Sequence, residues 1–239
     1  MAKRSCVLVH GGWCGGWHWD EVAARLRSLG GDVYAPTLAG MAERADEARP
    51  DTGLLAHVAD VVAVIDEHDL RDIVLVGHSY GGMVVSGAAH ERPDRIAELV
   101  YLDAWVPEDG QSLADILGPD FVASAHAAAD EAGTPTLVPP LYGVEDAVGW
   151  TGARAEAFAA RRSPTPIQTM YEAVTTNGCV AAQRSFIYCS AKSLGLFEAY
   201  ARTARESADW RYFELPSPHD AVHAMPAAVV GIIESIREH

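Results

Sequence analysis

Short runs of apolar residues alternate along the chain with segments in which apolar residues recur at helical spacing. The apolar runs cover 5–10, 32–35, 73–77, 97–102, 184–189 and 210–215. They are nearly continuous, which is typical of strands that are covered on both faces of a sheet. Helical spacing marks 17–29, 54–68, 80–91 and 226–237. This alternation predicts an α/β fold: a mostly parallel sheet flanked by helices.

The stretch 107–182 interrupts the alternation with Ala-rich helical pieces, scattered prolines and no clear strand. A long insertion within a compact domain usually has its own structure or task. We therefore predict one structural unit with a core of 1–106 and 183–239. The segment 107–182 would form a helical cap, inserted after the strand that ends near Asp103. An irregular surface excursion is the alternative.

Composition narrows the class of protein. With 239 residues, the chain is long enough for one domain with a lid. Its net charge of −15 argues against nucleic acid or an anionic membrane as a partner. The N-terminal residues lack a signal-peptide pattern and no window resembles a membrane span, so we expect a cytoplasmic protein. Its four cysteines lack metal-site spacing, and we expect free thiols.

A serine lies between glycines where the strand 73–77 ends, in "IVLVGHSYGG". Gly77-x-Ser79-x-Gly81 between a strand and a helix is the context of a nucleophile elbow, in which small residues let strand and helix pass closely. The N–H of Tyr80, just after the serine, would then stabilise an oxyanion. Ordinary turn chemistry is the alternative.

The first strand also ends in glycines, in "VLVHGGWCGGW". Because glycine lets the main chain approach a substrate oxygen closely, Gly11, Gly12 and Trp13 fit the second half of an oxyanion hole. A phosphate-binding loop is the rival interpretation. However, no Lys-Ser/Thr pair follows the glycines and no GxGxxG spacing is present.

His219 is the best candidate for a general base. It follows the last predicted strand, and loops at the carboxyl ends of parallel strands carry the chemistry of α/β proteins. His223 lies four residues later, but the pair lacks the Glu of HExxH and an evident third ligand, so we predict no metal site. We expect the side chain of His78 to point away from the cleft.

Four segments together resemble the α/β-hydrolase superfamily over essentially the full chain: "VLVHGGWCGGWHW", "VLVGHSYGGMV", "LDAWVPEDGQS" and "PHDA". The chain is most similar to the methyl-salicylate-esterase/hydroxynitrile-lyase-like group and its bacterial esterase relatives. The resemblance implies a Ser–His–acid triad under a helical cap, with no cofactor. It places the oxyanion donors at the N–H groups of Gly12 and Tyr80, and it is compatible with a homodimer.

The triad acid departs from that pattern. In the family it usually follows the strand that corresponds to 184–189, but here "CSAKSLG" contains no carboxylate, and Lys192 would oppose an imidazolium. Asp103 ends the strand after the nucleophile, where some α/β-hydrolases hold the acid. We therefore predict the triad Ser79–His219–Asp103. Glu108 and Asp109 are weaker alternatives, and Asp103 could instead cap the next turn.

The predicted activity is hydrolysis of a carboxylic ester of a small or medium, mostly apolar substrate through an acyl-enzyme. A lyase or other biosynthetic reaction on the same triad is one alternative, although Gly11 and Asp220 replace the Thr and Lys of hydroxynitrile lyases. A catalytically inactive ligand-binding fold is another. Trp13, Tyr142 and Trp150 are the candidate substrate-binding residues. No Arg/Lys cluster appears in the cap, which argues against a multiply charged substrate.

Overall fold

A computed structural model describes residues 3–177, 183–191 and 195–238. Its main sheet has six strands in the order β2-β1-β3-β4-β7-β8, and all neighbours pair in parallel. The strands are β1 (Cys6–Val9), β2 (Val33–Tyr34), β3 (Ile73–His78), β4 (Ile96–Leu102), β7 (Gln183–Cys189) and β8 (Trp210–Leu215). All six coincide with predicted apolar runs, so the predicted fold class is confirmed.

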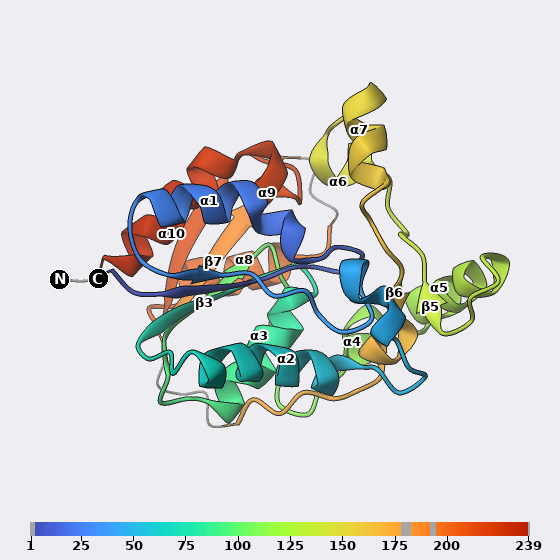
Figure 1. Cartoon of the computed structure of the whole chain (residues 1–239), viewed down its shortest axis with the longest axis horizontal. Coiled ribbons are helices and arrows are strands. Elements are labelled where there is room, and N and C mark those ends of the chain that lie inside the picture. Colours follow the sequence, from blue (N-terminus) through green and yellow to red (C-terminus); the bar gives the residue numbers. More distant parts are fainter. Residues whose placement is uncertain (1–2, 178–182, 192–194, 239) are drawn as a thin grey trace.

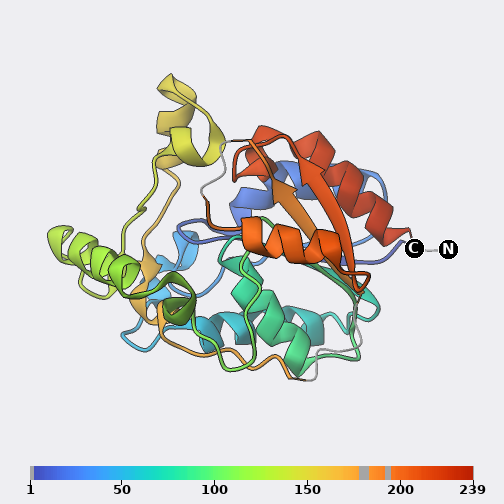
Figure 2. The same ribbon diagram turned by 180° about the vertical axis from the view of Figure 1, so that it is seen from behind.

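Helices cover both faces of the sheet (Figures 1 and 2). One face carries α1 (Asp20–Ser28), α9 (Ala221–Ala224) and α10 (Pro226–Arg237). The other carries α2 (Leu54–Glu67), α3 (Gly81–Glu91) and α8 (Glu198–Glu206). Short 3-10 helices occupy Gly16–Trp19, Ala42–Glu47 and Ile167–Met170. Two-sided cover explains why the strand sequences are almost wholly apolar.

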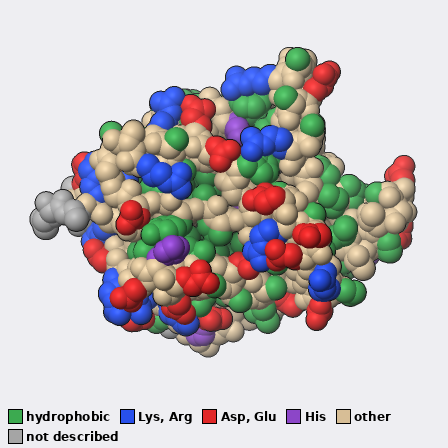
Figure 3. Space-filling model, in the orientation of Figure 1, with side chains coloured by type: hydrophobic (Ala, Val, Ile, Leu, Met, Phe, Trp, Pro, Cys, Tyr) green, Lys and Arg blue, Asp and Glu red, His purple; other side chains and the backbone are tan. Residues whose placement is uncertain are grey.

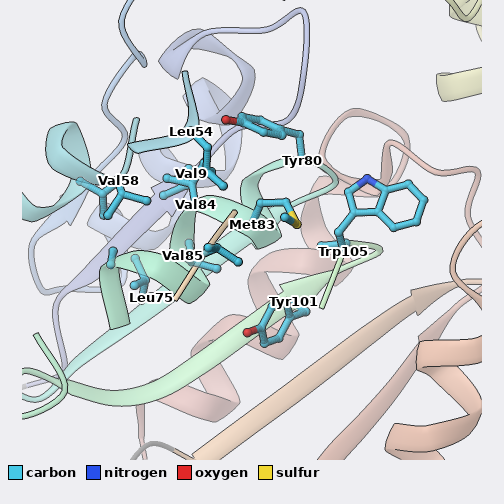
Figure 4. Close-up of a cluster of buried hydrophobic side chains, with 14 of the residues drawn as sticks. Val9, Leu54, Val58, Leu75, Tyr80, Met83, Val84, Val85, Tyr101 and Trp105 are labelled. Atoms are coloured by element: carbon cyan, nitrogen blue, oxygen red, sulfur yellow. The ribbon is translucent and has the colours of Figure 1, made fainter. Parts of the chain in front are cut away.

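The larger core cluster lies between the sheet and α2/α3 (Figure 4). Leu75 from β3 packs in it with Val58 from α2 and Val84 from α3. The same cluster continues to Tyr80 and Trp105, at the carboxyl edge of the sheet. Since each buried aliphatic side chain contributes about 1.5–3 kcal/mol, this core anchors the segments that carry the candidate site.

Between β4 and β7 the described residues form four α-helices: α4 (Leu113–Leu117), α5 (Pro119–Glu131), α6 (Val144–Val148) and α7 (Gly152–Ala159). They stand beyond the carboxyl edge of the sheet (Figures 1 and 2). The expectation of no strand here was wrong, because β5 (Leu137–Val138) and β6 (Thr165–Pro166) form an antiparallel pair. Two residues per strand are too few for an alternating pattern. The predicted end of the cap, at residue 182, lies outside the described residues, so this boundary stays a prediction.

The two connections between this helical segment and the core are bound to each other. Gly110 N–H donates to the carbonyl of Val174 at 2.9 Å, and Val174 N–H donates to the carbonyl of Gln111 at 3.1 Å. The Asp109 carboxylate accepts from the N–H groups of Thr176 and Asn177. We call residues 108–111 and 174–177 the clasp.

Charges of both signs are interspersed on the face shown in Figure 3, and apolar side chains gather on the projecting helices. Within the described ranges, no helix is long and apolar enough to cross a membrane.

Candidate active site

Ser79 occupies a strained turn between β3 and α3. Its φ of 54° is a left-handed conformation, which is uncommon for a residue with a side chain. A Cβ at Gly77 would lie 2.5 Å from the carbonyl oxygen of Gly81, and one at Gly81 would lie 2.7 Å from that of Val9. Both positions therefore require glycine. This is the nucleophile-elbow geometry that the sequence predicts.

His219 follows β8 and contacts Asp103. Its Nδ1–H donates to Asp103 Oδ2 at 2.6 Å, and this bond leaves Nε2 to accept a proton. Ser79 and His219 line the same cavity. Among the described hydrogen bonds, none involves the Ser79 hydroxyl. Bonds of this kind often tighten only when substrate binds.

Asp103 is buried, 3% exposed, and follows β4 with a φ of 42°. Its N–H donates to the carbonyl of Ile187 at 2.8 Å, and its Oδ1 accepts from Cys189 N–H at 3.2 Å. The end of β7 thus supplies a hydrogen-bond donor that orients this acid. Phe197, after β7, stacks on the His219 ring at a centroid distance of 5.2 Å.

The other acids considered for the triad lie elsewhere. Glu108 is exposed, and Asp109 belongs to the clasp. Lys192 lies outside the described residues. Asp103 is therefore the carboxylate that the structure brings to His219.

The loop 10–16 after β1, which we call the oxyanion loop, is hydrogen-bonded to the helical segment. Trp13 has a φ of 63°, its N–H donates to Thr165 Oγ1 at 2.8 Å, and its indole Nε1–H donates to the carbonyl of Val138 at 3.1 Å. No hydrogen bond among the described residues occupies the N–H of Gly12 or Tyr80. Both donors are available to an oxyanion.

Two neutral histidines brace these donors. The Tyr80 hydroxyl donates to His57 Nδ1 at 2.9 Å, while His57 Nε2–H donates to the carbonyl of Ala39 at 2.8 Å. His10 Nδ1–H donates to the carbonyl of Gly11 at 2.8 Å, and its Nε2 accepts from Leu38 N–H. Burial lowers the pKa of His57 to about 4 and that of His10 to about 3. Their tautomers are therefore fixed.

Most of the cavity lining is apolar and comes from the segment between β4 and β7. Of the three candidate substrate-binding residues, Trp13 and Tyr142 line the cavity, and their role in binding stays a prediction. Trp150 does not line it and packs edge-on against Phe158 and His223. The cap residues on the cavity wall are Leu113, Leu117, Phe121, Val138, Leu141, Tyr142, Ala147, Phe158, Arg162, Thr165, Thr169 and Met170.

His78 also borders the cavity, contrary to the expectation that it points away. Its ring lies 4.7 Å from that of His219, and its Nε2–H donates to the His219 carbonyl at 3.2 Å. Burial holds the pKa of His78 well below its usual range, so this ring stays neutral. Through this hydrogen bond, His78 holds the loop that carries His219.

One cluster has donor atoms that could hold a metal ion: His18, Asp220 and His223, whose ligand atoms lie within 4.8 Å of one another. Asp220 accepts from His18 Nε2–H and from His223 Nδ1–H, each at 3.1 Å. It also accepts from the N–H of His223 in α9. Burial raises the pKa of Asp220, but the two histidines outweigh it and hold this pKa well below its usual range. These hydrogen bonds account for the arrangement without an ion.

Cys14 and Arg162 are among the cavity-wall residues that sequence reasoning missed. Cys14 lies between the two glycine pairs of the oxyanion loop, and burial raises the pKa of its thiol, which stays protonated. Arg162 precedes "SPTP", where the chain turns back toward the core. A lone arginine gives no periodic signal, and only its place near β6 marks it.

Comparisons with known proteins identify the family. Residues 6–232 match the model of the Alpha/beta hydrolase family. A carbendazim hydrolyzing esterase of Nocardioides sp. (strain SG-4G) is 34% identical over 232 residues, 92% of this chain and 94% of that protein. Polyneuridine aldehyde esterase of Rauvolfia serpentina is 34% identical over 114 residues, 46% of this chain and 42% of that protein.

Among solved structures, an extracellular α/β-hydrolase from a Paenibacillus species superposes with a TM-score of 0.85 at 26% identity, covering 99% of this chain and 100% of that one. That protein is described as sharing structural and functional homology with tobacco Salicylic Acid Binding Protein 2. Since the family model spans most of the chain, this protein belongs to the alpha/beta hydrolase family, in its methylesterase-like group with bacterial esterase relatives.

Proposed function

We propose that the chain hydrolyses carboxylic esters through Ser79, His219 and Asp103. His219 Nε2 takes the Ser79 proton as Ser79 Oγ attacks the ester carbonyl. The N–H groups of Gly12 and Tyr80 stabilise the tetrahedral oxyanion. His219 then protonates the leaving alcohol, and a water that it activates releases the acid from the acyl-enzyme.

Ester hydrolysis is the reaction class of the matching relatives, which are named esterases and methylesterases. The chain is accordingly a carboxylic ester hydrolase. The contact between His219 Nδ1 and Asp103 Oδ2 is the observation that most supports this triad, because it fixes the tautomer that a base beside Ser79 needs.

The cavity supports a small or medium, mostly apolar substrate. Leu117, Phe121 and Met170 line it, and the Cys14 thiol stays protonated because burial raises its pKa. Apolar walls with a few polar groups are typical of sites for small organic molecules. A metal or cofactor has no step in this mechanism.

Lyase chemistry on the same triad is the alternative to ester hydrolysis. In the hydroxynitrile lyases a lysine follows the catalytic histidine, whereas here Asp220 does, engaged by His18 and His223. The positively charged residue at this position is thus replaced by a negatively charged one. This difference favours hydrolysis.

The test is turnover of acetate, butyrate and aryl esters by the wild type and by Ser79→Ala. We expect hydrolysis by the wild type and a loss in kcat of about 10⁶ in the variant, because the triad acts as a unit. Trapping of an acylated Ser79, seen by mass spectrometry, separates the acyl-enzyme from a lyase mechanism.

Equal turnover by both proteins would contradict the proposal. A wild type that reacts with a fluorophosphonate yet cleaves no ester would indicate a lyase or biosynthetic reaction. Failure to react with the fluorophosphonate as well would point to an inactive ligand-binding fold.

A further inference from the structure

Arg162 is the one cationic side chain on the described part of the cavity wall. It follows α7 and is half-buried. Its Nη1–H donates to the carbonyl of Tyr142 at 2.7 Å, and its guanidinium lies 5.5 Å from the centre of the Trp13 ring. Burial lowers the pKa of Arg162, yet guanidinium groups stay protonated.

No carboxylate of the described residues lies within ion-pair distance of this guanidinium, although Arg162 also borders an outer hollow that contains Asp20 and Glu43. Its chain neighbour Arg161 does pair with Asp20, at 3.3 Å. The segments outside the description contain no Asp or Glu. Of the five N–H donors of this guanidinium, one is used by Tyr142.

A half-buried charge without a counter-ion is costly, and such groups in binding sites commonly meet a ligand of opposite charge. The remaining charged groups nearby offer no substitute. Asp220 lies near enough to raise the pKa of Arg162, but its carboxylate already accepts hydrogen bonds from His18 and His223 and forms no ion pair with the guanidinium. The Cys14 thiol is neutral. The guanidinium therefore keeps N–H donors for a ligand of opposite charge in a largely apolar wall.

We infer that Arg162 binds a carboxylate of the substrate, so that the preferred substrates are half-esters: compounds with one ester and one free carboxylate joined by a short apolar spacer. The inference rests on the proposed ester hydrolysis. The planar guanidinium suits a carboxylate because it can donate two parallel hydrogen bonds. Hydrolysis would add water across the ester C–O bond. It would give a dicarboxylate and an alcohol where the free carboxylate is on the acyl side, and a carboxylate and a hydroxy acid where it is on the alcohol side.

The position of Arg162 indicates how the substrate lies. Trp13, beside the guanidinium, follows Gly12 directly in the chain, and Gly12 is a proposed oxyanion donor. The ester carbonyl and the carboxylate would therefore lie on either side of Trp13. A single charge at this point also agrees with the absence of an Arg/Lys cluster in the cap.

The test compares monomethyl glutarate with methyl butyrate, which lacks the carboxylate, as a ratio of kcat/KM values. We expect the wild type to prefer the half-ester, and Arg162→Gln to lower the ratio by about 10- to 100-fold, mainly through KM. Arg162→Lys should retain part of the preference. Arg161→Gln is the matched control and should leave the ratio unchanged.

A second pair of substrates places the carboxylate on the alcohol side, as in 3-acetoxypropionate against propyl acetate. The pair that shows the larger Arg162-dependent ratio identifies the side of the ester that faces the guanidinium. An equal ratio in wild type and Arg162→Gln for both pairs would overturn the inference.

Binding separates this inference from the proposed reaction. In Ser79→Ala, which cannot form an acyl-enzyme, calorimetry should detect monomethyl glutarate, and the additional change Arg162→Gln should weaken binding about 10- to 100-fold. If Ser79→Ala binds the half-ester and the wild type cleaves no ester, the proposed function fails and the carboxylate site stands. Equal binding with and without Arg162 would refute the site.

Discussion

The carboxyl edge of the sheet and the helical cap above it are built differently. At the edge, Trp13, Ser79 and Asp103 all have positive φ, and a Cβ at Gly82 would meet the carbonyl oxygen of Trp105. Among the described residues of the cap, only glycines have a positive φ. At one of them, Gly133, a Cβ would have open space around it.

This contrast separates two tasks. Strained backbone persists only where the surrounding packing holds it, and the edge lies against the largest core cluster. The edge therefore fixes the positions of the reacting groups. The cap lines the cavity and carries none of the proposed reacting groups, and Thr165 and Val138 link it to the edge through their hydrogen bonds with Trp13.

After the loss expected for Ser79→Ala, the largest expected effect of a change at the edge is the one at Asp103. Asp103→Asn keeps the size of the side chain but removes the charge that stabilises the His219 imidazolium. We expect kcat to fall by about 10³–10⁴ with the fold intact, as measured by ester turnover and circular dichroism.

Asp109→Asn is the matched control for this prediction. Asp109 lies in the clasp, where it accepts hydrogen bonds from Thr176 and Asn177, and it has no contact with His219. Its replacement should leave kcat within about threefold of wild type, since surface changes have small effects. A larger loss of kcat for Asp109→Asn than for Asp103→Asn would show that Asp103 is not the triad acid.

Stability should respond to glycine replacement in the same order. In Gly82→Ala the new methyl group meets the backbone of Trp105, which cannot move away, and we expect a loss of about 3 kcal/mol or more in the free energy of unfolding. Gly133→Ala meets nothing and suffers only its φ of 69°, a cost of about 1 kcal/mol. Urea unfolding of both variants gives the two values. Equal losses would remove the distinction between edge and cap.

Low pH should destabilise the protein because two buried histidines that brace the edge, His10 and His57, are held neutral in the folded state. His10 and His57 have folded pKa values of about 3 and about 4, below the value of about 6.5 for the unfolded chain. The stability that they contribute is full above pH 6.5 and is lost as the pH falls toward those folded values.

At pH 5 these two histidines should therefore take up about two protons on unfolding, and the free energy of unfolding should change by about 2.7 kcal/mol per pH unit from this source. Urea unfolding between pH 4.5 and 7 measures the slope. In His57→Gln the slope should fall by the share of one proton. An unchanged slope in that variant would show that His57 is not held neutral.

The smallest effect is expected in the cap. Phe121→Ala widens the cavity wall without touching the reacting groups. The preference for hexanoate over acetate esters, as a ratio of kcat/KM values, should rise about tenfold, because added methylene groups gain a place to pack. An effect on acetate turnover as large as that on hexanoate would mean that the cap also positions the chemistry.

The same division decided what the sequence could predict. Continuous apolar runs identified all six strands of the main sheet, and because parallel strands share one carboxyl edge, Ser79, Asp103 and His219 could be grouped without a structure. Asp103 was predicted as the acid partly from the family resemblance: the loop that usually carries the acid has no carboxylate here, and some α/β-hydrolases hold it at this strand. The cost of burying an unpaired carboxylate at Asp103 also supported the prediction.

The cap gave no comparable rule. The two-residue strands β5 and β6 are too short to show a period. Trp150 was assigned to the pocket because it is large and apolar, yet it packs against Phe158. Arg162 was overlooked because what distinguishes it is that no carboxylate of the described residues lies within ion-pair distance of its guanidinium. Only the three-dimensional packing shows this.

The clasp has a consequence for how this enzyme could be rebuilt. Since Gly110 and Gln111 are bonded directly to Val174, the whole intervening stretch leaves and re-enters the core at a single point. To the core it is an insert with adjoining ends, so a different stretch spliced between Gln111 and Val174, which keeps these hydrogen bonds, would not pull the strands apart. Different inserted segments could in this way be combined with one hydrolytic centre, each giving the enzyme a different substrate cavity.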